Sequence, residues 1–368
     1  MKSTDIFVIG GGPAGLAMAI AARQRGFQVM VADGMRPPID KACGEGLMPD
    51  GLEAIEQLGI ELPVAGAYPF RGIRFLSRSL FTDASFPDGG RGLAMRRTVL
   101  HQVMAERASQ VEAKLRWGAV IRGIMSDGVY VGSDFVRARW IVGADGSSSR
   151  VRRWAGLEES HRPRLRYAFR QHYRVEPWTD YMEVHWGSRC QGYATAVGED
   201  QVCVAMASHD PRLRAEEGLK QLPWLSARLR GAEVISTERG AVTGNLRLKR
   251  VWRDNVALVG DAAGTVDAIT GEGLGLAFRH ATALAKCIEA GDLAPYQRIH
   301  DQLALRPWLM ARLMLTLDGR PGLQHRTLQV FDKRPEIFRH LLALHVGSLP
   351  PQKLLRDGLT LGWELLTT

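Results

Sequence analysis

Hydrophobic residues near the start of the chain fall into short continuous runs. One run covers residues 5–9 and ends at three glycines, and another covers residues 27–32 and ends at Asp33. Continuous apolar runs bounded by glycine are typical of buried parallel strands. The stretch between them, residues 16–22, is rich in alanine and favours a helix. The opening of the chain therefore predicts a complete strand–helix–strand unit.

The pattern changes in the middle of the chain. Residues 97–109 predict a helix, and segments near 114–124 and 128–143 predict a small antiparallel excursion. From residue 161 to 208, short segments separated by turn formers indicate a separate antiparallel sheet. The strands predicted for this sheet are residues 167–175, 181–186, 192–197 and 202–207.

The last part of the chain returns to the first unit and then becomes helical. Residues 256–259 predict a strand that rejoins the opening unit. From residue 272 onward the pattern is nearly all helical, and Pro307, Pro321 and Pro335 are expected to interrupt it. The apolar residues between 303 and 315 predict a helix packed on the first domain, in preference to a lid for a lipophilic substrate or a membrane-surface helix.

Composition adds limits to this picture. No stretch approaches eighteen apolar residues without a charge, so we predict no stable membrane insertion. The cysteines Cys43, Cys190, Cys203 and Cys287 have neither CxxC nor CxxH spacing. Together with the absence of a secretion-signal pattern, this predicts reduced thiols in a cytoplasmic protein and no metal site.

The net charge of +9 is carried mostly by dispersed arginines, with no basic stripe interleaved with aromatic residues. We therefore predict no nucleic-acid partner, and we interpret the charge as a field that attracts anionic dinucleotides. The expected partner is a small-molecule substrate, and the expected assembly is a monomer or a weak homodimer.

The glycines after the first predicted strand form a dinucleotide-binding fingerprint. Gly10, Gly12 and Gly15 have the G-x-G-x-x-G spacing, directly after a strand and at the start of a helix. The first permits a tight turn, the second lets the backbone approach a pyrophosphate, and the third allows close helix–strand packing. Asp33 ends the second strand, where its carboxylate can accept the hydroxyls of an adenosine ribose.

Further motifs distinguish FAD from NAD. Asp261 follows a strand and a glycine, Asp145 begins an Asp-Gly turn after another strand, and Arg97 opens a predicted helix. Along the chain the glycine fingerprint, Arg97, Asp145 and Asp261 follow the order of the p-hydroxybenzoate hydroxylase superfamily, which the chain resembles over most of residues 1–290. The resemblance implies that Asp261 binds a ribityl hydroxyl and that Arg97 lies near the FAD phosphates.

Two loops resemble the geranylgeranyl reductase branch of the same superfamily. They are the Cys-Gly-Glu-Gly segment at residues 43–46 and the Thr-Gly-Glu-Gly segment at residues 270–273, and flavin halogenases share the second. The second is a glycine loop at a helix N-terminus, whose N–H groups can face the N1–C2=O edge of the flavin ring. Cys43 either modulates the flavin or is a small residue in a tight loop.

The resemblance implies an α/β fold with a Rossmann-like FAD-binding domain of glutathione reductase type. Three chain segments, residues 1–69, 93–160 and 240–290, are expected to build this domain. An antiparallel β-sheet substrate domain is expected from residues 70–92 and 161–239, and C-terminal helices from residues 291–368. The predicted FAD contacts are Gly10, Gly12, Pro13, Ala14, Gly15, Asp33, Cys43, Gly44, Arg97, Asp145, Asp261, Gly271, Gly273 and Leu274.

The predicted chemistry follows from the strand at residues 192–198. Its Gly-Tyr-Ala-Thr-Ala-Val-Gly resembles the Tyr-Val-Thr-Pro-Val-Gly of monooxygenases, and it lacks the tryptophan segments of halogenases and most prenyl reductases. We therefore predict an FAD-dependent monooxygenase that uses NADH or NADPH and O2 to hydroxylate or epoxidise an apolar, aromatic or polyketide-like molecule. The alternatives are a C=C reductase or dehydrogenase of geranylgeranyl reductase type, and a non-catalytic flavin-binding module.

The candidate catalytic residues lie on the predicted strands of the substrate sheet and are expected to face the substrate. The two histidines among them are candidate bases for a phenolic proton. The set is Arg170, His172, His185 and Tyr193, with Tyr181 as a further substrate-facing candidate.

Overall fold

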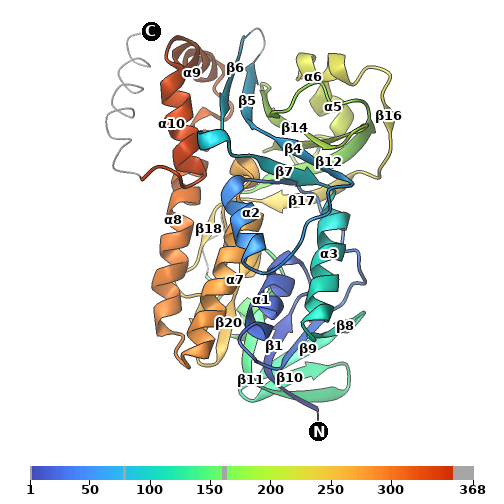
Figure 1. Ribbon diagram of the computed structural model, residues 1–368, viewed down its shortest axis with the longest axis vertical. Coiled ribbons are helices and arrows are strands. Elements are labelled where there is room, and N and C mark those ends of the chain that lie inside the picture. The colour runs from blue at the N-terminus through green and yellow to red at the C-terminus, as the bar shows by residue number, and fades with distance from the viewer. Residues whose placement is uncertain (1, 78–79, 160–163, 351–368) are drawn as a thin grey trace.

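The computed structural model describes residues 2–77, 80–159 and 164–350. Two large sheets dominate it, and the sheet that contains the first strand of the chain lies at the bottom of Figure 1 and the second sheet at the top. Long C-terminal helices run along one side and connect the two levels. The mixed α/β class with an antiparallel sheet and C-terminal helices is confirmed.

The lower sheet is parallel at its centre. In spatial order its strands are β19 (Trp252–Arg253), β20 (Val256–Leu258), β11 (Asp134–Gly143), β1 (Lys2–Ile9), β2 (Val29–Asp33) and β8 (Lys114–Trp117). The strands from β20 to β8 are parallel neighbours, whereas β9 (Ile121–Met125) and β10 (Gly128–Val131) form an antiparallel extension of β11. Residues 114–117 thus correct the prediction of an antiparallel excursion, because they pair with β2 at the edge of the parallel sheet.

Helices cover this sheet and pack against one another. The central one is α1 (Pro13–Arg23), which is buried along nearly its whole length and contacts both α3 (Arg97–Gln110) and α7 (Gly273–Glu289). Because α1 has neighbours on several sides, its sequence is apolar all round instead of striped. The shorter α2 (Pro49–Glu56) packs on α7, and α4 (Arg150–Trp154) follows β11.

The upper sheet is the second large sheet and lies above the lower sheet in Figure 1. Its order is β16 (Glu233–Val234), β12 (Arg166–Arg174), β15 (Gln201–Ser208), β14 (Cys190–Gly198), β13 (Met182–Trp186), β5 (Gly72–Ser77) and β6 (Leu80–Ser85), with α5 (Ala215–Leu219) and α6 (Pro223–Arg228) beside it. All neighbours are antiparallel except β13 and β5. The segment β17 (Arg239–Thr243) also pairs with β12, so the chain leaves this sheet a few residues later than the expected boundary at 240.

Small elements join the two levels. One is a three-stranded sheet of β3 (Gly46–Leu47), β7 (Gly92–Met95) and β4 (Ala67–Phe70), and another is the pair of β18 (Leu246–Arg247) and β21 (Gly264–Thr265). Short 3-10 turns occupy Pro87–Gly89, Gly260–Ala263 and Ala268–Thr270.

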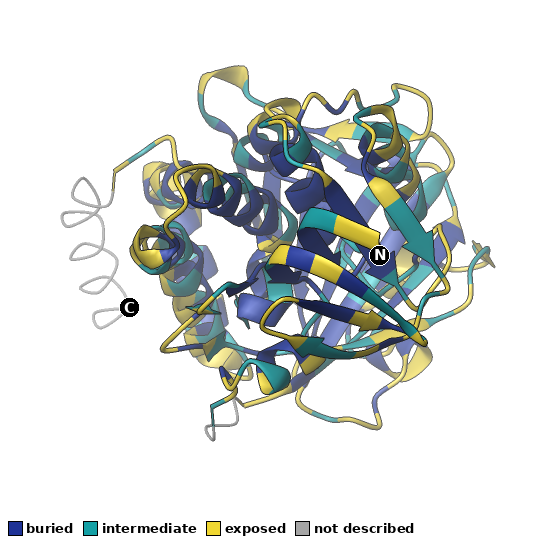
Figure 2. Cartoon of the chain, turned by 90° about the horizontal axis from the view of Figure 1, so that it is seen from below, coloured by how far each residue is buried: buried dark blue, intermediate teal, exposed yellow. Residues whose placement is uncertain are grey.

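The C-terminal helices are α8 (Ala294–Leu317), α9 (Pro321–Lys333) and α10 (Pro335–His345). Pro321 and Pro335 begin helices, but Pro307 does not interrupt α8, which corrects the expectation. Proline in a helix interior removes one backbone hydrogen bond and costs about 3 kcal/mol. Pro307 is buried, so tertiary packing holds this helix together across it. Figure 2 shows buried segments at the centre and exposed positions on outer loops and helix faces.

A stacked histidine pair is buried where α7 meets α8. The rings of His280 and His300 lie 4.0 Å apart, and His280 Nε2–H donates to the His300 carbonyl at 3.3 Å. Burial lowers the pKa of both rings, and for His280 the neighbouring His300 lowers it further. Both rings are therefore neutral in the folded protein near pH 7.

This pair predicts a loss of stability in mild acid. Below the unfolded-state pKa of 6.5 the unfolded chain binds protons that the folded rings do not, so the free energy of unfolding falls by about 1.4 kcal/mol per pH unit for each ring. Above that pH neither state gains a proton and the effect vanishes. We expect His280→Gln to flatten this decline in urea titrations between about pH 5 and 8, whereas His325→Gln, at an exposed position of α9, should not. Equal slopes in all three proteins would contradict the assignment.

Candidate functional site

A cavity of about 700 Å³ lies between the two sheets and the C-terminal helices. Its lower wall comes from the loops at the carboxyl ends of β1, β2, β11 and β20. Ligands of open α/β sheets bind at this edge because the loops and helix N-termini converge there. All predicted FAD contacts except Gly15 line this cavity.

The glycine fingerprint has the geometry that a pyrophosphate requires. Gly10 has φ of +110°, and a Cβ there would overlap the Ala144 carbonyl. A Cβ on Gly15 would overlap the Gly10 carbonyl, so this glycine sets the approach of α1 to β1. At Gly12, in contrast, a Cβ would meet no atom of the described residues within 4 Å, because the position opens on the cavity. The wall is therefore bare backbone at the start of a helix, which favours an anion.

Acidic and basic groups surround this loop. Asp33 accepts the Gly11 N–H at 2.6 Å and the Met35 N–H at 2.7 Å, which aims its carboxylate at the cavity edge. Arg97 lines the cavity, and its Nε is buried without a hydrogen-bond partner among the residues that the structure describes. A phosphate oxygen is the group that such a donor lacks. The donors and acceptors here fit the phosphates and ribose of FAD.

The other two predicted aspartates have protein partners. Asp145 accepts the N–H groups of Arg150 at 2.7 Å and Val151 at 3.1 Å, and so organises the turn that leads into α4. Asp261 forms an ion pair with Lys41 at 2.9 Å, and both side chains are about two-fifths exposed. Lys41 was not among the expected site residues, and it places a positive charge on the cavity wall beside Asp261.

Among the candidate catalytic residues of the upper sheet, some face the cavity and others do not. Tyr193 lines the cavity, as do Met182, Val184 and Trp186 of the adjacent strand β13. Because strand side chains alternate between faces, His185 lies on the opposite face, where its Nε2 contacts Glu183 at 3.0 Å. The expectation that His185 faces the substrate is therefore corrected. Tyr181 likewise lies off the cavity and contacts Ser85 through its hydroxyl at 3.1 Å.

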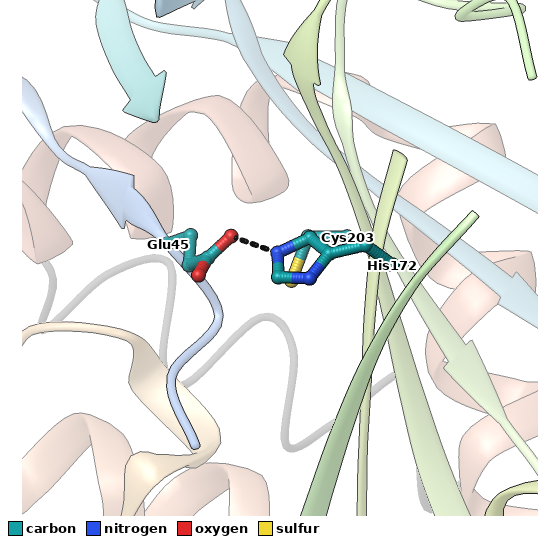
Figure 3. A group of neighbouring side chains, drawn as sticks. All are labelled: Glu45, His172 and Cys203. Carbon is teal, nitrogen blue, oxygen red and sulfur yellow. Dashed lines mark hydrogen bonds and ion pairs between the residues drawn. The ribbon is translucent and has the colours of Figure 1, made fainter. Parts of the chain in front are cut away.

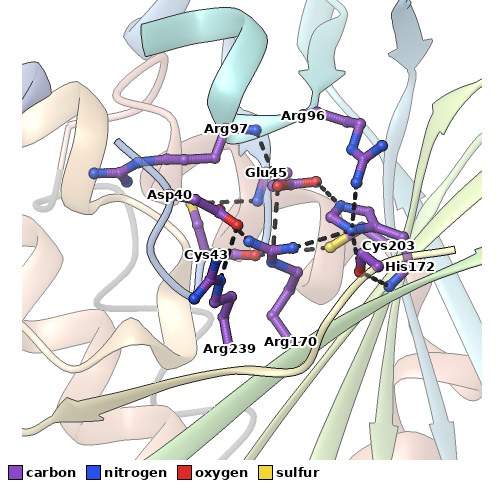
Figure 4. Close-up of polar contacts among 10 residues, drawn as sticks. Asp40, Cys43, Glu45, Arg96, Arg97, Arg170, His172, Cys203 and Arg239 are labelled. Atoms are coloured by element: carbon purple, nitrogen blue, oxygen red, sulfur yellow. Dashed lines mark hydrogen bonds and ion pairs between the residues drawn. The ribbon is translucent and has the colours of Figure 1, made fainter. Parts of the chain in front are cut away.

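Arg170 and His172 belong to a buried polar network instead of the cavity wall. Figure 3 shows the Glu45 carboxylate facing the His172 ring, with the Cys203 sulfur beside it. His172 Nε2 lies 2.7 Å from Glu45 Oε2, and Glu45 Oε1 accepts the Arg97 N–H at 2.9 Å. Glu45 belongs to the lower unit, whereas His172 on β12 and Cys203 on β15 belong to the upper sheet. The cluster therefore joins the two units (Figure 4).

The arginines in this network determine which nitrogen of His172 carries the proton. Arg170 Nη1 lies 3.0 Å and Arg96 Nη2 lies 3.3 Å from His172 Nδ1. Since guanidinium groups only donate, Nδ1 must accept and Nε2–H must donate to Glu45. Glu45, Cys203 and His172 together offer three ligand atoms within 4.8 Å of one another. However, burial and Glu45 raise the pKa of the Cys203 thiol well above its usual range, which opposes the thiolate that a metal needs.

The network holds the Cys43 loop against the upper sheet. Asp40 pairs with both Arg170 and Arg239, and Cys203 Sγ lies 3.7 Å from the Cys43 carbonyl (Figure 4). Glu45 itself has φ of +62°, a conformation that costs a non-glycine residue free energy unless its surroundings enforce it. The interdomain contacts of Glu45 supply that constraint. The sequence showed this residue only as one letter of a loop motif, since its partner His172 lies 127 residues away.

A second buried chain of polar groups positions Tyr193. Arg166 is fully buried and donates to Asp267 and to Gln191 Oε1, both at 2.8 Å. The Tyr193 hydroxyl donates to the same Gln191 oxygen at 3.2 Å. Burial raises the pKa of Tyr193, so its hydroxyl keeps its proton at neutral pH.

Beyond these groups the cavity becomes an apolar chamber. Phe75 stacks on Trp186 at 4.9 Å between ring centroids and contacts Phe338 at 5.1 Å. Phe338 in turn stacks on Phe331 at 4.9 Å. The chamber is completed by Met310, Leu313, Met314, Leu317, Leu341 and Leu342 of α8 and α10. Sequence reasoning missed this wall, although the apolar spacing along residues 303–315 was visible.

The comparisons place the chain among flavoproteins. Residues 3–291 match the family described as FAD binding domain. Digeranylgeranylglycerophospholipid reductase 1 of Methanothermobacter thermautotrophicus is 29% identical over 298 residues, 74% of each chain. Menaquinone reductase of Mycobacterium tuberculosis is 28% identical over 330 residues, 79% of this chain and 78% of that one. Rifampicin monooxygenase of Streptomyces venezuelae is 30% identical over 167 residues, 42% of this chain and 34% of that one.

A flavoprotein/dehydrogenase from Cytophaga hutchinsonii has the same fold. The two structures superimpose with a TM-score of 0.85 over 100% of this chain and 99% of the other, at 16% identity. Within the described residues, none of the helices combines the length and hydrophobicity needed to cross a membrane.

The open side of Gly12 generates a test of cofactor binding. We expect Gly12→Val to abolish FAD retention, because the added side chain occupies the path of the pyrophosphate while meeting no protein atom. The measurement is flavin absorbance per protein after reconstitution with FAD and gel filtration. Gly322→Val is the control, since Gly322 also has open space around its Cβ but lies on α9. Retention of FAD by the Gly12 variant would place the cofactor elsewhere.

Proposed function

Because this chain belongs to the FAD binding domain family and is an FAD-dependent oxidoreductase, we propose that it reduces carbon–carbon double bonds in an isoprenoid chain. Two relatives that span about three-quarters of the chain are reductases named for geranylgeranyl and menaquinone compounds, whereas the match to rifampicin monooxygenase covers 42% of it. The predicted monooxygenase activity therefore becomes the second candidate.

The apolar chamber is the observation that carries the proposal. Aromatic and aliphatic side chains from the upper sheet, α8, α9 and α10 surround a space continuous with the flavin loops. An isoprenoid chain is flexible and wholly apolar, so it gains free energy of about 25 cal/mol for each Å² of surface removed from water. Such a chamber aligns a double bond with the flavin without needing a polar group on the reacting segment.

Different residues of the cavity have different roles in the proposed reaction. When bound and reduced, FAD would supply a hydride, that is two electrons and one proton, to one carbon of the double bond. The second carbon needs a proton, and the Tyr193 hydroxyl holds one on the cavity wall. Gln191 and the buried Arg166 orient this hydroxyl. The aromatic cluster around Phe75 excludes water, and the network around Glu45 holds the loop with Cys43 at the lower wall.

The monooxygenase candidate rests on a specific feature. The strand that carries Tyr193 resembles the monooxygenase segment and lacks the tryptophan found in most prenyl reductases. A flat aromatic substrate also fits against stacked rings. NADH or NADPH as the source of electrons is proposed for both reactions.

A single turnover distinguishes the two candidates. The FAD-loaded protein is reduced with dithionite under nitrogen and mixed with a geranylgeranylated lipid, which carries no quinone that the reductant could reduce directly, and the product mass is measured. We expect the substrate to gain two hydrogens before any oxygen is admitted. The control is the same protein with the flavin left oxidised. A substrate unchanged under nitrogen that acquires oxygen-18 from labelled O2 would replace the reductase with the monooxygenase.

The chamber wall gives a matched pair of variants. Leu313 and Leu309 lie one turn apart on α8 and are 36% and 45% exposed, but only Leu313 lines the cavity. Leu313→Trp should narrow the chamber and lower kcat/KM for a long isoprenoid substrate by about tenfold or more, because pocket shape discriminates at this level. Leu309→Trp should leave it unchanged. Equal kcat/KM values for the two variants would show that the chain does not enter this chamber.

A further inference from the structure

A buried titratable pair, Glu272 and His345, connects α10 to the predicted flavin loop at residues 270–273. His345 at the end of α10 lines the cavity, and its Nε2 lies 3.1 Å from the Thr270 carbonyl. Its Nδ1 lies 3.3 Å from Glu272 Oε2. Glu272 is 4% exposed and immediately precedes Gly273, the first residue of α7. The pair therefore lies at the helix N-terminus that forms part of the cavity wall.

The hydrogen-bond chemistry leaves room for one additional proton. A carbonyl only accepts, so His345 Nε2 carries a hydrogen and Nδ1 has the lone pair. Neither oxygen of Glu272 has a hydrogen-bond partner among the described residues, although both are buried. A proton bound at Nδ1 or at Oε2 would be shared across the 3.3 Å between them.

The surrounding charges set the state of this pair. Glu272 faces Arg306 of α8 at 3.6 Å, and Arg306 and Arg279 both bind Asp50 of α2. Two arginines, Asp50 and an ionised Glu272 sum to zero charge when His345 is neutral, so one more proton makes the cluster positive. Burial raises the pKa of Glu272 and Asp50 adds to this, while His345, Arg306 and Arg279 act in the opposite direction.

We propose that the Glu272–His345 pair takes up a proton when the bound flavin is reduced. Two electrons and one proton leave the flavin ring with one added negative charge, which the N-terminus of α7 is positioned to stabilise. A second proton from solvent then binds the pair and makes the cluster positive beside that charge. Reoxidation releases the same proton. The inference requires FAD binding and is independent of which substrate is reduced or hydroxylated.

The test measures how the flavin midpoint potential depends on pH in the FAD-loaded full chain. For a two-electron couple, each additional proton changes the equilibrium constant tenfold per pH unit, which is about 30 mV. Between about pH 5 and 8, where histidine is the side chain that ordinarily changes charge, we expect His345→Gln and Glu272→Gln each to lose this additional slope. His325→Gln, on the exposed face of α9, is the control and should retain it.

A merely structural role would shift the potential by the same amount at every pH, so the slope separates the two explanations. Identical slopes in the wild type and both variants overturn the proposal. If a variant loses FAD, a measurement on the wild type tests the proposal instead. An indicator dye should then report the uptake of two protons for each two electrons, while the absorbance spectrum shows anionic reduced flavin. Uptake of one proton under these conditions also overturns it.

Discussion

The close approach of α1 to the strands beneath it is the constraint on which the cavity depends. The first turn of this helix lies against β1 and β11 because Gly10 and Gly15 carry no Cβ at the points of contact. A side chain at either position would push the helix outward, and the backbone N–H groups at its start would no longer border the cavity. Because α7 and α3 pack on α1, they take their positions from the same contact. The flavin loop at the start of α7 is thereby placed opposite the glycine fingerprint.

Buried charge ties the second domain to this frame. Apolar packing between two sheets permits sliding, whereas paired charges have directional partners and tolerate little displacement. Asp40 and Glu45 lie on one loop of the lower unit and contact Arg170 and His172 of β12. Arg166, also on β12, donates to Asp267, which precedes the flavin loop. These contacts cross the boundary between the domains. They fix the position of the upper sheet, and of Tyr193 on it, relative to the cofactor site.

The C-terminal helices convert this dinucleotide site into a site with an apolar chamber. The helix α8 runs alongside both domains, and α9 and α10 pack on β5 and β6 (Figure 1). Their inner faces provide most of the wall beyond the flavin loops, and His345 returns to the loop itself. The glycine fingerprint and most of the apolar chamber wall are therefore supplied by different parts of the chain.

The amino-acid sequence by itself determined the α/β class, the flavin fingerprint and the fold of the first domain. These depend on local relations, such as the spacing of Gly10, Gly12 and Gly15 after a short apolar strand, which a linear pattern records. The face of the sheet on which His185 lies depends on the register of β13, because a shift by one residue exchanges the two faces. His172, the partner of Glu45, and Thr270, the partner of His345, are more than 70 residues distant from them in the chain. Only the packing of the two sheets and α10 brings those groups together, and no local pattern contains that information.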